Sequence, residues 1–143
     1  AGDEFGTPGY ADAVRKAVER MVRLKKVRWR GERLVSGTIV RHLIIPGNID
    51  NTRRVLEWYA ATCADRALLS LMVQYVPVRD PSGRGVTSDE YERALRLLDE
   101  FGIEEGYVQE LDDDRSWLPD FEKVMSFPSP DVGMIWHWKT GFV

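Results

Sequence analysis

The sequence predicts an α/β fold with a parallel sheet. Stretches of helical periodicity alternate with short apolar runs rich in β-branched residues, in the order helix, strand, helix, strand, helix, strand. This alternation is typical of βα units, in which helices connect parallel strands. A sheet of only three strands would leave its edges exposed. The sequence therefore predicts a slice of a (β/α) barrel rather than a whole barrel.

The first helix is predicted over Tyr10–Lys25. Its apolar residues recur at helical spacing with charged residues between them, and Pro8-Gly9 marks its start. The first strand is predicted over Thr38–Ile45, a nearly continuous apolar run that ends at Pro46-Gly47. Such a run is typical of a strand buried on both faces, as in parallel sheets covered by helices.

A second helix and a second strand follow. We expect Asp50 or Asn51 to cap the helix, which then continues to about Cys63. The second strand is predicted over Ala67–Val76 and ends at the proline that follows it. Residues 79–85 are expected to form a loop.

The third helix begins at a capping-box pattern, Thr87–Glu90, and ends at Gly102, the residue type that most often follows a helix. A short strand is predicted over Tyr107–Leu111. The remaining sequence is aromatic, proline-rich and irregular. We therefore divide the chain into residues 1–115, which form the βα units, and residues 116–143, a C-terminal extension packed on them.

Composition excludes some classes of partner. The net charge of −3 argues against nucleic acid or an anionic membrane as the main partner, because both require a basic surface. The charge is uneven, since residues 23–33 contain six basic residues and residues 104–114 contain six acidic ones. The basic run is expected to be a solvated helix end and loop, with RNA binding through its arginines and Trp29 as the alternative.

The single cysteine, Cys63, excludes a disulfide within the chain and favours a cytoplasmic protein. No run of about 18 apolar residues is present, so no membrane span is predicted. With one cysteine and two histidines, no protein-only zinc site is expected. No arrangement of Ser, His and Asp, or of Cys and His, indicates nucleophilic catalysis. The chain begins without methionine, and we expect it to be part of a longer protein.

The candidate binding residues lie where the strands end, because parallel sheets bind ligands at the carboxyl ends of their strands. Alternation places Arg41 and Leu43 on one face of the first strand and His42 on the other. A buried arginine is costly unless it meets an anion, so Arg41 indicates either a carboxylate or phosphate ligand or an interior salt bridge. His42 is expected to be a hydrogen-bonded core residue. Ser70 and Gln74 would line a ligand site or form an internal hydrogen-bond network.

Several segments, taken in order, resemble the radical S-adenosylmethionine (radical SAM) proteins related to pyruvate formate-lyase activating enzyme. The segment RHLIIPG resembles the family's R-H-L-(V/I)-(L/I)-P-G motif, and SLMVQYVP resembles its S-L-M-x-Q-Y-x-P strand. The segment TSDEYERALRLLDEFGIEEGYVQEL is similar to its T-x-x-E-Y helix and the strand that follows. Together with DEFGTPGYADAVRKAVERM and SWLPDF, these segments cover most of residues 3–121.

The resemblance implies the C-terminal slice of a partial (β/α)6 TIM-like barrel. The complete enzyme would bind a 4Fe–4S cluster and S-adenosylmethionine, and would cleave the latter reductively to a 5′-deoxyadenosyl radical. In the branch that it resembles, this radical activates a glycyl radical enzyme. The resemblance places Arg41 and Leu43 at the S-adenosylmethionine site, with Arg41 on the methionine carboxylate. It places Gln74 and Tyr75 near the ribose.

The chain departs from the family's pattern in two ways. It lacks the C-x-x-x-C-x-x-C motif, so it cannot supply the three thiolates that hold the cluster and is not competent alone. The family's histidine after the tyrosine is also missing, since Val76 and Pro77 follow Tyr75.

The partners that follow are a glycyl radical enzyme as protein substrate, or the chain's own N-terminal half. An exposed strand edge would also allow pairing with a second copy. Three alternatives stay open. The chain is a non-catalytic binding or interaction domain derived from such a barrel, or it is a subunit completed by a separate N-terminal half. The third alternative is an unrelated α/β fragment that binds a phosphorylated metabolite at Arg41.

Overall fold

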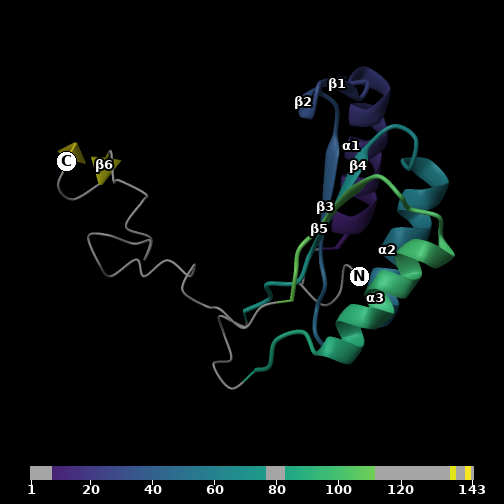
Figure 1. Ribbon diagram of the computed structural model, residues 1–143, viewed down its shortest axis with the longest axis vertical. Helices are drawn as coiled ribbons and strands as arrows, with labels where there is room; N and C mark the ends of the chain where they lie inside the picture. Colours follow the sequence, from purple (N-terminus) through teal and green to yellow (C-terminus); the bar gives the residue numbers. More distant parts are fainter. Residues whose placement is uncertain (1–7, 77–82, 112–135, 138–140, 143) are drawn as a thin grey trace. The chain divides into compact units, whose positions relative to one another are not determined.

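The computed structural model of the chain describes residues 8–76, 83–111, 136–137 and 141–142 (Figure 1). The chain divides into two compact units, Ala1–Leu111 and Asp112–Val143. In the second unit the described residues form one antiparallel pair, β6 (Trp136–His137) and β7 (Gly141–Phe142). The other residues of the extension predicted over 116–143 lie outside the described residues. Residues 79–82 of the predicted loop also lie outside them.

The first unit is a mixed α/β structure, which confirms the predicted class. Its parallel sheet contains β3 (Ile39–Leu43), β4 (Leu68–Met72) and β5 (Gly106–Val108), in the order β3-β4-β5. Helices α2 (Ile49–Thr62) and α3 (Ser88–Glu100) provide the crossovers between these strands. The strands thus follow one another in the sheet as they do in the chain.

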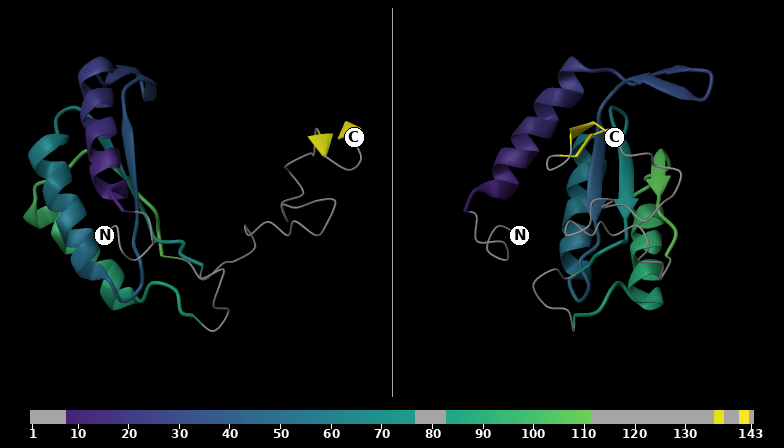
Figure 2. Two further views of the ribbon diagram at one scale, coloured as in Figure 1. Left: turned by 180° about the vertical axis from the view of Figure 1, so that it is seen from behind. Right: turned by 90° about the vertical axis from the view of Figure 1, so that its left-hand side faces the viewer.

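The helices cover only one face of this sheet (Figure 2, left). Side chains at alternate positions of β3 and β4 are buried there, and they are Val40, His42, Ile44, Leu69, Leu71 and Val73. On the other face, Ile39 and Arg41 are exposed. The prediction of a strand buried on both faces was therefore wrong for Thr38–Ile45, because the described part of the chain supplies helices to one side only.

Helix α1 (Tyr10–Leu24) confirms the predicted first helix to within one residue. It packs on the core through Val22, which is buried, and through Val18. A second apolar row on α1 remains exposed, and it consists of Tyr10, Val14, Met21 and Leu24. Among the described residues, no helix has the length and apolarity to cross a membrane.

The segment after α1 is a hairpin rather than the predicted helix end and loop. Strand β1 (Arg28–Arg30) pairs antiparallel with β2 (Arg33–Ser36). The two-residue turn begins at Gly31, whose φ of 57° suits the turns that join such short hairpins. The sequence did not predict this hairpin, because two of the three residues of β1 are basic and such a run is typical of a solvated segment.

The predicted caps were right for one helix and wrong for the other. Helix α2 is capped by Asn48, whose side chain accepts a hydrogen bond from the backbone N–H of Asn51, rather than by Asp50 or Asn51 themselves. The helix begins earlier because Ile49 packs against the core. Helix α3 has the predicted capping box between Thr87 and Glu90.

Candidate functional site

The candidate site is the face of the sheet that the helices leave uncovered. We call it the open face, and it carries Ile39, Arg41 and Leu43 of β3, Leu68, Ser70 and Met72 of β4, and Tyr107 of β5. Leu68, at the start of β4, is buried, whereas Ile39, Arg41 and Tyr107 are exposed. Register pairs Arg41 with Ser70 and Ser70 with Tyr107, so these three side chains form one row across the sheet. The row combines a cation, a hydroxyl and a phenol.

Arg41 is exposed on this face and not buried as the sequence predicted. In the described unit it therefore needs no anion to offset a cost of burial. No described acidic residue forms an ion pair with it. The interior salt bridge, one of the two explanations for this residue, therefore has no partner in the part of the chain that the structure describes. An exposed guanidinium with free donors is suited to bind a carboxylate or phosphate.

The other three predicted site residues lie near the carboxyl ends of the strands. Leu43 shares the open face with Arg41 and is half-buried. Gln74 and Tyr75 follow β4 outside any strand, and both are half-buried. The backbone N–H of Tyr75 donates to the carbonyl of Val73 over 2.8 Å, which makes a tight turn there. Because Leu43 pairs with Met72, this segment starts beside the end of β3.

The carboxylate of Glu90, which the sequence predicts only as part of the capping box of α3, also binds the turn after β3. Glu90 accepts a hydrogen bond from the backbone N–H of Gly47 at 2.6 Å and from that of Thr87 at 2.9 Å. The Arg84 guanidinium donates to both carboxylate oxygens, at 2.6 and 2.8 Å. Arg84 and these backbone donors hold the pKa of Glu90 well below its usual range. We call these four residues the Glu90 cluster.

His42 is a core residue, as predicted. Its Nε2 atom lies 3.0 Å from the hydroxyl oxygen of Thr52, and the pair is buried beneath α2. Burial lowers the pKa of His42 from 6.5 to about 4. The imidazole is therefore neutral at pH 7 and faces away from the open face.

Acid is expected to destabilise the unit through His42. As the pH falls below 6.5, His42 takes up a proton in the unfolded chain, whereas in the folded chain it stays neutral down to about pH 4. The contribution of neutral His42 is therefore complete above pH 6.5 and is lost toward pH 4, about 3 kcal/mol in total. Urea titrations at several pH values measure this. His42→Gln should flatten the profile over this interval, Thr52→Ser should keep it, and an unaltered profile in His42→Gln would contradict the assignment.

Cys63 does not belong to the site. It is fully buried at the end of α2, and burial raises the pKa of its thiol. A protonated thiol in an apolar core is a poor metal ligand. Within the described ranges, no group of three or more His, Cys, Asp or Glu residues is placed to hold a metal ion.

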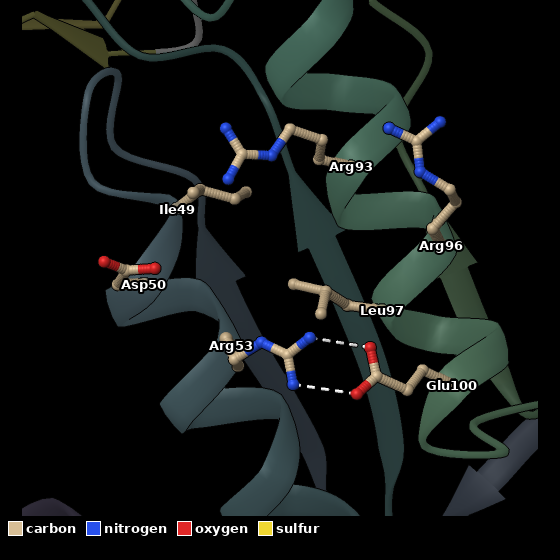
Figure 3. A pocket seen from close by; sticks show the side chains of 7 residues that line it. All are labelled: Ile49, Asp50, Arg53, Arg93, Arg96, Leu97 and Glu100. Carbon is tan, nitrogen blue, oxygen red and sulfur yellow. Dashed lines mark hydrogen bonds and ion pairs between the residues drawn. The ribbon is translucent and has the colours of Figure 1, made fainter.

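A groove between α2 and α3 has a volume of about 320 Å³. Figure 3 shows Arg53 of α2 and Glu100 of α3 pointing toward one another across it. Their two hydrogen bonds are 2.8 and 2.7 Å long, and Arg53 also lies 5.6 Å from the centre of the Phe101 ring. Both partners are exposed, so this ion pair across the groove contributes little to stability.

These features define a two-layer α/β unit, in which helices cover one face of a parallel sheet and Arg41 stands exposed on the other. Comparisons of the chain with protein-family models, with curated proteins and with solved structures find no match.

Proposed function

We propose that this chain is the C-terminal part of a radical SAM enzyme of the pyruvate formate-lyase activating type. In this proposal the open face forms one wall of the S-adenosylmethionine cleft. The observation that carries it is the open face itself, where exposed Arg41 stands on a parallel sheet whose crossover helices lie on one side only. The motifs quoted above supply the reaction type.

The sheet topology supports a slice of a partial (β/α)6 barrel. In a whole doubly wound sheet the strand order reverses and helices cover both faces, whereas one half of such a sheet shares sequential strands and one-sided helices with a barrel wall. Here the order β3-β4-β5 follows the chain and the helices stay on one face. A barrel wall has this arrangement, with its interior where the open face lies.

Two features of the described unit support the proposal that an N-terminal half completes it, namely an unpaired strand edge and an exposed apolar row. Strand β3 is an edge of the described sheet, so its outer backbone groups have no strand partner there. Helix α1 lies beyond that same edge (Figure 2, right) and exposes its apolar row. One more βα unit would pair with β3 through its strand and cover α1 with its helix, burying both surfaces together.

The residues present fit one of the two cofactors. Arg41 would bind the carboxylate of S-adenosylmethionine, and Ser70 and Gln74 would add hydrogen bonds along the cleft. The cofactor, once bound at a reduced cluster, supplies a 5′-deoxyadenosyl radical. The cluster itself does not fit this chain, whose single thiol is buried, so another part of the protein would hold it.

The proposal is tested on the complete reading frame. We expect an in-frame C-x-x-x-C-x-x-C motif before Ala1. The full protein, purified without oxygen and reconstituted with iron and sulfide, should bind S-adenosylmethionine and release 5′-deoxyadenosine when reduced with dithionite. A complete frame without three such cysteines would refute the proposal. It would then favour the non-catalytic interaction domain.

Arg41→Ala in the complete enzyme is expected to weaken S-adenosylmethionine binding by about 1.5–3 kcal/mol, the range for hydrogen bonds to a charged group. Calorimetry measures the change. Arg54→Ala on α2 removes another exposed arginine away from the open face and should leave the affinity unchanged. Equal affinities in the two variants would remove Arg41 from the site.

A further inference from the structure

The end of α1 and the hairpin of β1 and β2 that follows it carry positive charge that no described residue neutralises. Residues 23–33 include six basic residues against one acidic residue, Glu32. All six are exposed. None of them forms an ion pair with another residue of the described part of the chain. This run therefore keeps its charge available to a partner.

Two of these cations face each other directly. Register places Arg30 of β1 opposite Arg33 of β2. Like charges at directly opposed positions destabilise a strand pair, and a hairpin of this length has little stability to spare. A carboxylate between the two guanidinium groups would remove the repulsion and gain charge-assisted hydrogen bonds.

The opposite face of the hairpin is apolar. Register places Trp29 opposite Leu34, one residue away from the arginine pair and therefore on the other face. Trp29 remains 43% exposed, and Leu34 is half-buried. Over the two residue pairs nearest the turn, the hairpin is thus a ribbon with a cationic side and an apolar side, and a register shift between Arg28 and Trp29 interrupts the pattern beyond them.

The ribbon also has free backbone edges. It is a two-stranded sheet of its own, and neither strand pairs with another described strand. It projects away from the three-stranded sheet (Figure 2, right). We propose that the hairpin is a docking site for an extended protein segment in which acidic and apolar residues alternate, and that this segment adds to the ribbon as a third strand.

The alternation of charged and apolar side chains between the two faces of the hairpin favours this partner over nucleic acid. Side chains of an added strand point alternately to the two faces, so acidic ones meet Arg30 and Arg33 while apolar ones meet Trp29 and Leu34. A single nucleic acid strand binds by stacking bases on aromatic rings while its phosphates meet cations on the same surface. Here the ring and the arginine pair lie on opposite faces.

The test measures fluorescence anisotropy of a labelled short peptide in which glutamate and valine alternate. A peptide of the same composition, with its glutamates and valines in two separate blocks, is the matched control. The alternating peptide should bind at least about tenfold more tightly, the equivalent of about 1.4 kcal/mol. Oligothymidine of similar length should bind more weakly than the alternating peptide. Equal binding of the two peptides, or tighter binding of oligothymidine, would overturn the proposal.

Variants locate the site. Arg30→Glu with Arg33→Glu should weaken binding of the alternating peptide at least about tenfold. Arg15→Glu with Lys16→Glu makes the same charge change at exposed positions of α1 and should change binding less than about twofold. Arg30→Gln with Arg33→Gln removes the charge without reversing it. This variant should weaken peptide binding by a factor between those of the other two variants. Circular dichroism checks that each variant is folded. Equal losses in the hairpin and α1 variants would show a general charge effect and refute a site on the hairpin.

Discussion

Replacing Gly106 by alanine is expected to detach β5 from the sheet and to lower the free energy of unfolding by about 3 kcal/mol or more. Gly106 begins β5 with a φ of 154°, a conformation that other residues rarely adopt. A Cβ atom there would clash with the backbone carbonyl oxygen of Leu69 on β4. Because the obstructing atoms belong to the backbone of the central strand, they cannot turn aside as a flexible side chain would.

Urea unfolding followed by circular dichroism measures this loss. Gly102→Ala is the matched control, since its φ of 64° is also left-handed but no atom lies within 4 Å of its added Cβ. That variant should lose only about 1–2 kcal/mol, the cost of the backbone conformation. Similar losses in the two variants would show that β5 does not approach β4 as closely as the register requires.

Glu90→Gln is expected to lower the free energy of unfolding by about 2–4 kcal/mol, because it weakens several hydrogen bonds to one charged and buried group. Glu90 is only 8% exposed and accepts from Gly47, Arg84 and Thr87. A glutamine has one acceptor oxygen, and its amide nitrogen would face a donor. One of the backbone N–H groups would then lose its partner.

The matched control is Glu100→Gln, the same substitution on the same helix. Glu100 also binds an arginine through both oxygens, but both partners are exposed. Its loss should stay below about 1 kcal/mol, as for other surface ion pairs. Equal effects would mean that burial adds nothing to the Glu90 cluster.

The Glu90 contribution should depend on pH with a definite sign. The pKa of Glu90 is lowered from its ordinary value of 4.5. Its stabilising effect is therefore present above about pH 4.5 and is lost as the pH falls through the lower folded pKa. The difference between the wild-type chain and Glu90→Gln should shrink in that acid range, and a difference that stays constant there would contradict the shift.

The Glu90 cluster also bears on the proposed cleft. It joins the turn after β3, through Gly47, to the start of α3. That turn follows directly on the strand that carries Arg41 and Leu43. In the enzyme that we propose, a loosened turn would change the position of the rim of the cleft without removing any of the side chains proposed to bind the cofactor.

Local patterns predicted the features that neighbouring residues determine. The capping box at Thr87, the left-handed Gly102 and the extent of α1 follow from chemistry within a few residues of each. Alternation correctly placed Arg41 and His42 on opposite faces of β3, because the pleat has a period of two residues.

Local patterns failed where a distant segment decides the outcome. The carboxylate of Glu90 reaches Gly47 across 43 positions of sequence, which no helix-capping rule includes. Arg41 was expected to be buried because its neighbours are apolar, yet its exposure depends on which layers cover the sheet. The two strands of the hairpin pair through backbone groups, which a pattern of charged side chains does not reveal.

By itself, then, the sequence determined the order of helices and parallel strands, the caps of α3 and the face on which each residue of β3 and β4 lies. These depend on backbone geometry and on contacts between near neighbours. Only the tertiary structure decided that the described elements leave one face of the sheet uncovered, that Glu90 holds the turn after β3, and that the basic run enters a two-stranded hairpin. Each of these depends on how segments far apart in the chain meet, and on how much surface the described elements can cover.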